Sequence, residues 1–295
     1  MNSWHLITSG HLTRNKFWGE DEGKMYHPVI STTTVIQTGN YNILVDPSMN
    51  ADQMKMELYS RCGLRAEEID LIYSTHKHYD HWMGVDGFPN AEFYMASEDL
   101  DYLHKHMDYI PNDRVDILKK AKPAREKLVE GISLVALPGH TMGLQGLLFE
   151  GPEGKILIAG DSVMTYEFFQ AKEGYFFSVS DELSKKSIEK AAQIADFIIP
   201  GHGNYFSVKA YPFKVNEEKE KADRVQASKE HQITVKSKIS EILKLKGAMN
   251  VFQTFFHHQL PISDLMVNED MPLLAYIINL DQEIADQMLA AFNQL

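Results

Sequence analysis

The sequence predicts an α/β protein, and two observations support that prediction. Short apolar and β-branched stretches alternate with segments of helical pattern along the first 210 residues, as in α/β folds. Four of the apolar stretches lead directly into a histidine or an aspartate, at the carboxyl end where α/β sheets bind their ligands. A chain of 295 residues, 44% of them apolar, is long enough to bury a large core.

The first predicted elements are a hairpin and a helix. Residues 29–48 contain two β-branched stretches on either side of Gly39-Asn40, a two-residue turn signal. We therefore expect a hairpin whose second strand ends near Asp46. A helix is expected to follow at about residues 52–61.

Four later strands are expected to end beside polar side chains. The stretch EIDLIYSTH, residues 68–76, is an apolar strand that leads into a group of histidines. Three further apolar stretches end at His140, Asp161 and His202. Because the carboxyl ends of such strands form the ligand-binding rim of an α/β sheet, we expect these side chains to lie in one site.

The remaining segments are an aromatic loop and helices. We expect a loop at residues 165–180 and a helix at about 181–195, whose apolar face recurs at helical spacing. The composition then becomes charged and helix-prone, so residues 211–295 are expected to form a helical extension to a domain of residues 1–210.

The segment from His76 to His81 contains three histidines and one aspartate, which suits metal binding. Alternate residues of an extended chain point the same way, so His76 and His78 can reach one ion while Lys77 points elsewhere. The chain is then expected to turn into a helix, from whose first turn Asp80 and His81 would reach a second ion.

Imidazole and carboxylate ligands without a thiolate favour zinc, with iron, manganese or nickel as alternatives. Each ion needs more ligands than the histidine segment supplies. His140, His202 and Asp161 are the natural candidates, and the carboxylate of Asp161 could bridge two ions through its two oxygens.

The His-x-His-x-Asp-His segment, followed by a histidine, an aspartate and a histidine at strand ends, resembles the metallo-β-lactamase superfamily. The resemblance covers about residues 1–210 and implies a four-layer αββα sandwich with a dinuclear site at one edge. It implies that one metal is held by His76, His78 and His140, the other by Asp80, His81 and His202, and that Asp161 bridges them.

The resemblance implies a metal-dependent hydrolase. Two divalent ions would share a water and convert it to a bridging hydroxide, which attacks the carbonyl of a small carboxylic ester, lactone or thioester. Asp80 is placed to accept or return a proton as well as to bind metal. The alternatives are a phosphodiesterase acting on a small phosphodiester and a non-catalytic metal-binding scaffold.

Several residues near the predicted ligands allow two interpretations. Tyr79, Tyr166, Phe168 and Phe169 could line a substrate pocket, or they could pack in the core or at a subunit interface. Asp46 could hydrogen-bond to the histidine segment, or it could simply form the turn before the following proline. The sequence leaves a homodimer open.

Charge and composition indicate which partners to expect. The 29 basic and 41 acidic residues give a formal net charge of -12, which would repel long nucleic acid or an anionic membrane. The single cysteine, Cys62, cannot form a disulfide within the chain, and no signal-peptide pattern or spanning apolar run is visible. We expect a cytoplasmic protein with a small-molecule substrate and no membrane contact.

Overall fold

The computed structural model describes residues 2–39, 41–124 and 128–214. Residues 2–12 and 29–213 belong to one compact unit, and Thr13–Pro28 belongs to a second unit. The predicted helical extension lies outside the described residues from position 215 on. Among the described residues, no helix is long and apolar enough to cross a bilayer.

One sheet of the first unit has six strands in the order β1-β2-β3-β4-β5-β6. Their bounds are Ser3–Thr8, Thr33–Thr38, Tyr41–Val45, Leu71–Ser74, Glu92–Ala96 and Lys122–Ala124. Strands β1 to β3 pair antiparallel, and β3 to β6 pair parallel. The predicted hairpin is confirmed, because β2 and β3 are adjacent antiparallel strands.

The other sheet has five strands in the order β11-β10-β9-β8-β7. In chain order from β7 to β11 the bounds are Ile132–Ala136, Gln145–Gly151, Gly154–Gly160, Phe197–Pro200 and Phe206–Ser207. Strand β8 is antiparallel to both β7 and β9, and β9 is parallel to β10. Strands β7, β9 and β10 therefore run in the same direction, and their carboxyl ends lie at the same edge.

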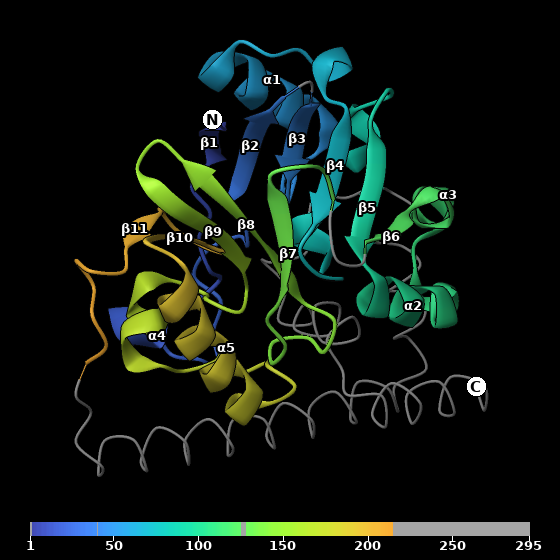
Figure 1. Cartoon of the computed structure of the whole chain (residues 1–295). Coiled ribbons are helices and arrows are strands. Elements are labelled where there is room, and N and C mark those ends of the chain that lie inside the picture. The colour runs from blue at the N-terminus through green and yellow to red at the C-terminus, as the bar shows by residue number, and fades with distance from the viewer. Residues whose placement is uncertain (1, 40, 125–127, 215–295) are drawn as a thin grey trace, which may run out of the picture. The chain divides into compact units, whose positions relative to one another are not determined.

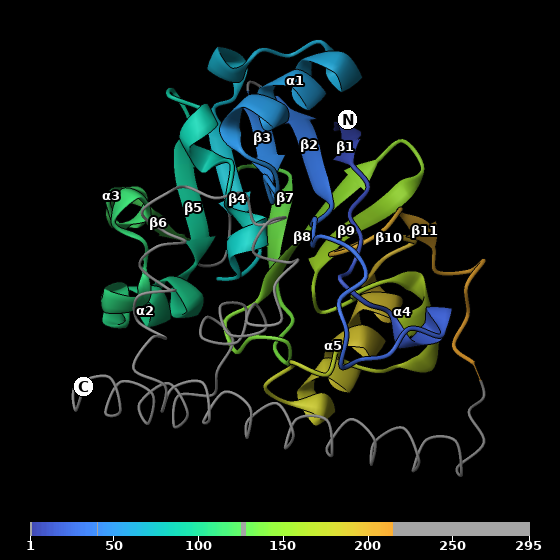
Figure 2. The ribbon, with the colours of Figure 1, turned by 180° about the vertical axis from the view of Figure 1, so that it is seen from behind.

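The helices flank the two sheets (Figures 1 and 2). Their bounds, from α1 to α5, are Ala51–Cys62, Ser97–Lys105, Asn112–Lys120, Tyr166–Ala171 and Asp181–Ile194. The predicted helices at 52–61 and 181–195 correspond to α1 and α5. The expected loop at 165–180 is wrong in part, because it contains α4. Residues Asp80 and His81 lie in a single 3-10 turn, Tyr79–His81, rather than in an α-helix.

Alternate side chains of each sheet enter different cores, which builds four layers. In β3, Leu44 packs in the core that α1 shares, whereas Ile43 packs between the two sheets. In β9, Ile158 packs between the sheets, whereas Leu157 packs in the core that α5 shares. Because strand side chains alternate in direction, each sheet is buried on both faces. The predicted αββα sandwich is confirmed.

The Thr13–Pro28 segment, described by itself, is organised by local polar contacts. The Asn15 side chain accepts a hydrogen bond from the backbone N–H of Phe17 and begins a 3-10 turn, Lys16–Trp18. The Nε2 atom of His27 lies 2.9 Å from Oε1 of Glu20. The second contact joins residues that are 7 positions apart in this segment.

Candidate metal centre

The seven residues predicted as metal ligands come together in the structure. All of them follow the carboxyl end of a strand: the histidine segment follows β4, His140 follows β7, Asp161 follows β9 and His202 follows β10. They form two groups suited to a metal ion, one of His76, His78, His140 and Asp161, the other of Asp80, His81 and His202. The sheet directions therefore explain why residues so distant in sequence meet.

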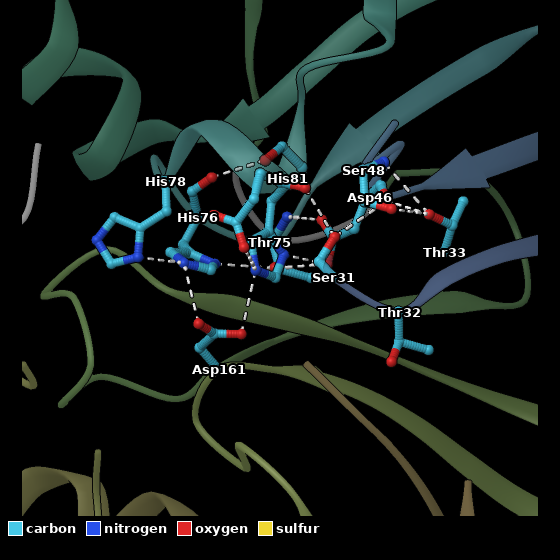
Figure 3. Close-up of polar contacts among 12 residues, drawn as sticks. Ser31, Thr32, Thr33, Asp46, Ser48, Thr75, His76, His78, His81 and Asp161 are labelled. Carbon is cyan, nitrogen blue, oxygen red and sulfur yellow. Dashed lines mark hydrogen bonds and ion pairs between the residues drawn. The ribbon is translucent and has the colours of Figure 1, made fainter. Parts of the chain in front are cut away.

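Three ring nitrogens of the first group converge on one point. The Nδ1 atom of His78 lies 2.8 Å from Nε2 of His76 and 2.8 Å from Nε2 of His140. Figure 3 shows His76 pointing toward Asp161, with a ring nitrogen of His78 directed at His76. The Oδ2 atom of Asp161 lies 3.1 Å from Nε2 of His140 and 3.7 Å from Nε2 of His76. This arrangement presents three nitrogens and one oxygen to a common position.

The second group meets the other oxygen of the same aspartate. The Oδ1 atom of Asp161 lies 3.1 Å from Nε2 of His81 and 3.4 Å from Nε2 of His202. The Oδ2 atom of Asp80 lies 3.7 Å from each of these two nitrogens. Asp161 thus presents one carboxylate oxygen to each group.

The two groups differ in their electrostatics. Burial lowers the pKa of His76 and of His78 well below the usual value, which favours the neutral rings that bind metals. Burial acts in the same direction on His81 and His202, but the carboxylates of Asp161 and Asp80, joined at His81 by that of Asp46, together outweigh it and raise the pKa of both. Burial would raise the pKa of Asp161, yet the surrounding histidines hold it well below its usual range.

The residues fit a divalent metal ion. Nε2 of His81 and Oδ1 of Asp161 are buried and make no hydrogen bond, although they lie 3.1 Å apart. Buried polar atoms nearly always have a partner, and a cation between them would supply it. The donor set of imidazole and carboxylate suits zinc and other borderline divalent ions. Cys62 takes no part, because its thiol donates to the carbonyl of Leu58.

Residues behind the ligands fix which ring nitrogen faces the centre. The backbone carbonyl of Ile30 lies 2.9 Å from Nδ1 of His202 and can only accept, so Nδ1 holds the proton and Nε2 is left bare. The carboxylate of Asp46 pairs electrostatically with Nδ1 of His81 at 2.9 Å, which favours a proton on that nitrogen. The structure therefore supports the contact of Asp46 with the histidine segment.

Asp99, at the start of α2, is a supporting residue that the sequence analysis missed. Its buried carboxylate accepts hydrogen bonds from the backbone N–H of Lys77 at 2.9 Å, the Thr141 hydroxyl at 2.7 Å and the backbone N–H of Gly143 at 3.0 Å. These bonds connect the loop of His76 and His78 to the loop of His140. An acidic residue in the first turn of a helix is ordinary, so its sequence position gives no signal.

Three of the four predicted pocket residues lie on α4, and the fourth, Tyr79, lies in the 3-10 turn beside Asp80. The Tyr79 ring packs edge-to-face on Trp82, and burial raises the pKa of Tyr79 to about 12. Phe168 and Phe169 are buried in α4, each 1% exposed. Tyr166 is 40% exposed. A contact of any of the four with substrate stays a prediction.

Comparison with known proteins identifies the family. The sequence model of the Metallo-beta-lactamase superfamily matches residues 27–202, which include all seven predicted ligands. The chain belongs to this superfamily. The matched range also includes both sheets except for β1 and β11.

Several members of the superfamily are similar to this chain. An N-acyl homoserine lactonase from Bacillus sp is 30% identical over 156 residues, which cover 50% of this chain and 60% of the lactonase. The metallo-beta-lactamase domain-containing protein 1 of Xenopus laevis is 27% identical over 213 residues, covering 70% of this chain and 82% of that protein. The chain thus matches three fifths of the lactonase and most of the Xenopus protein.

Solved structures agree with the fold. A quorum-quenching N-acyl homoserine lactone lactonase superposes with a TM-score of 0.53 at 22% identity, covering 68% of this chain and 91% of the lactonase. The hydrolase AbOPH of the beta lactamase superfamily superposes with a TM-score of 0.52 at 16% identity, covering 73% of this chain and 95% of the hydrolase. At these identities the likeness establishes the fold alone.

Proposed function

We propose that the chain is a dinuclear metal-dependent hydrolase that cleaves a small carboxylic ester, lactone or thioester. The observation that supports this most strongly is the placement of Asp161, whose two oxygens face two separate ligand groups. The first group would hold one divalent ion, the second group the other, and Asp161 would bridge them. Zinc is the ion that the donor set favours.

When bound, two divalent ions would lower the pKa of a water and polarise the scissile carbonyl. The residues of the chain have their own tasks in this reaction. Asp161 faces both groups, and His76 and His78, whose pKa values burial lowers, present neutral rings to the centre. The side chain of Asp80 is 13% exposed, so its Oδ2 can take the proton of the attacking water and return it to the leaving oxygen or sulfur.

Apolar side chains beside the centre favour an apolar acyl group. Met142 follows His140 by two residues and is 49% exposed. Val179, 36% exposed, donates its backbone N–H to the carbonyl of His140 at 3.3 Å. Two exposed apolar residues on segments that contact a metal ligand would receive the acyl chain of a substrate. The similarity to lactonases supports an acylated lactone as the first compound to test.

The proposal is tested with a panel of acyl lactones, aryl esters and acyl thioesters. We expect turnover of at least one class, its loss on treatment with a chelator and its return on adding zinc. The Asp161→Ala variant should be inactive on the same compound. Absence of chelator-sensitive turnover across the panel, in protein shown to contain metal, would overturn the proposal.

The proposed partner of the chain is a small-molecule substrate, as expected from the sequence. A small-molecule substrate fits a site built at the edge of two sheets. The cytoplasmic location and the homodimer stay predictions.

A further inference from the structure

The hydroxyl of Thr75 lies between a buried carboxylate and a metal-ligand histidine (Figure 3). Its Oγ1 atom is 2.9 Å from Oδ2 of Asp46 and 3.1 Å from Nδ1 of His76. Thr75 and His76 are 0% exposed, and Asp46 is 1% exposed. Both contacts are therefore shielded from bulk water.

The chemistry of the three groups fixes the direction of these hydrogen bonds. A hydroxyl has one proton, and a carboxylate only accepts, so the Thr75 hydroxyl donates to Asp46. The hydroxyl oxygen then accepts the Nδ1–H of His76. That assignment leaves Nε2 of His76 without a proton. Nε2 is the atom that faces the other members of the first group, and it lies 2.8 Å from Nδ1 of His78.

The same carboxylate oxygen also serves the second ligand group. Oδ2 of Asp46 lies 2.9 Å from Nδ1 of His81, whose Nε2 faces Asp161 at 3.1 Å. Asp46 therefore reaches His81 directly and His76 through the hydroxyl of Thr75. The buried carboxylate of Asp46 therefore orients one histidine of each ligand group.

Packing holds the Thr75 hydroxyl in this position. The backbone N–H of Thr75 donates to Oδ1 of Asp46 at 2.8 Å, and its carbonyl accepts from the backbone N–H of Gln145 at 3.0 Å. A Cβ at Gly160, which has a φ of 51°, would lie 2.5 Å from the Thr75 oxygen. The side chain is thus closely packed against the backbone that precedes Asp161.

We propose that Thr75 is a positioning residue that selects the metal-binding tautomer of His76, so that Asp46 sets the ligand state of both metal groups. This inference rests on the proposed metal centre. Residues that orient a ligating histidine typically change metal affinity by about 10–100-fold when replaced. Thr75 does not touch the metal or the substrate in this arrangement.

The test compares Thr75→Val, which removes the hydroxyl at constant shape, with Thr75→Ser, which keeps it. Thr34→Val is the matched control, because the Thr34 hydroxyl is buried without a hydrogen-bond partner. In metal-free protein, the tautomer of each histidine is measured by nitrogen-15 NMR of the imidazole rings. Zinc affinity is then measured by competition with a chromophoric chelator.

We expect Thr75→Val to lose the Nδ1–H form of His76 and to weaken zinc binding by about 10–100-fold at one of two sites. Thr75→Ser and Thr34→Val should retain both properties. Asp46→Asn supplies a second route should Thr75→Val fold poorly: it should also change the tautomer of His76.

An unchanged His76 tautomer in Thr75→Val, or in Asp46→Asn, would overturn the inference. The inference would also be overturned if Thr34→Val changed the His76 tautomer as much as Thr75→Val does. The tautomer is measured without metal or substrate. A protein that shows the expected NMR result but, once shown to contain metal, hydrolyses no compound of the panel would therefore refute the proposed function and leave this inference standing.

Discussion

The Oδ1 atom of Asp161 lies 3.1 Å from Nε2 of His81, while its Oδ2 atom lies 3.1 Å from Nε2 of His140. The backbone leaves little freedom for this carboxylate, because a Cβ at Gly201 would lie 1.9 Å from Oδ1. A single side chain therefore faces both ligand groups from a fixed position.

Replacing Asp161 should weaken both groups together. We expect Asp161→Asn to lose metal from both sites and to lower kcat/KM at least about 100-fold, because the amide keeps one oxygen but loses the charge that the cations need. Metal content and turnover are measured side by side. Asp196→Asn is the control, since Asp196 is exposed and accepts from the backbone N–H of Lys155. Retention of both metals in Asp161→Asn would contradict the bridging role.

Replacing Asp99 should weaken the first group alone. In Asp99→Asn, one carboxylate oxygen becomes an NH₂ group, which donates and would face another donor. That donor is the backbone N–H of Gly143 in one orientation of the amide; in the other orientation the NH₂ faces the backbone N–H of Lys77 and the hydroxyl of Thr141. We expect about 10–100-fold weaker metal binding at one of two sites. Asp101→Asn, an exposed position in the same helix, should bind as the wild type does. Equal weakening of both sites would show that Asp99 acts on the whole fold instead.

The two groups should release metal at different pH. Burial lowers the pKa of His76 and of His78, whereas the neighbouring carboxylates, Asp161 first among them, together outweigh burial and raise the pKa of His81 and of His202. A histidine with a raised pKa keeps its proton to a higher pH, and the metal must displace that proton. As the pH falls from about 8 to about 5, the second group should therefore empty first.

Cobalt-substituted protein provides the measurement, because the two sites have different ligands and hence different absorption bands. We expect two separate losses of absorption along the acid titration. A single step, or earlier loss from the group of His76 and His78, would contradict the assignment of the charges.

The meeting of the seven proposed ligands could be predicted from sequence because their chemistry and their strand-end positions are local signals. Asp161 and His202 each follow a short apolar stretch, and the directions of β9 and β10 bring them to one edge. Asp99 could not be predicted in this way. Its role depends on three partners from two distant loops, and nothing in its own segment distinguishes it from an ordinary acidic residue at a helix start.

The aromatic segment after Asp161 shows a second limit of sequence reasoning. Phe168 and Phe169 suggest a pocket as much as a core, because aromatic side chains serve both. The helix α4 directs both rings inward, where Phe169 lies 5.1 Å from the ring of Phe206. Helix α4 has only 6 residues, too few to show an apolar periodicity. Asp46 is similar, since a turn and an ion pair with His81 predict the same residue type.

Removing the Phe169 ring should therefore affect stability. We expect Phe169→Ala to lower the free energy of unfolding by about 3–5 kcal/mol, the cost of a large cavity in a buried core. Tyr166→Ala, at an exposed position in the same helix, should change it by no more than about 0.5 kcal/mol. Denaturant unfolding of the two variants measures both values. A Phe169→Ala variant of unchanged stability would contradict the core position.

The central claim is that seven side chains hold two divalent ions bridged by Asp161. Anomalous diffraction from crystals of zinc-loaded protein tests it directly. We expect two peaks, one beside His76, His78 and His140 and the other beside Asp80, His81 and His202, with Asp161 in contact with both. A single peak, or two peaks away from these residues, would contradict the claim.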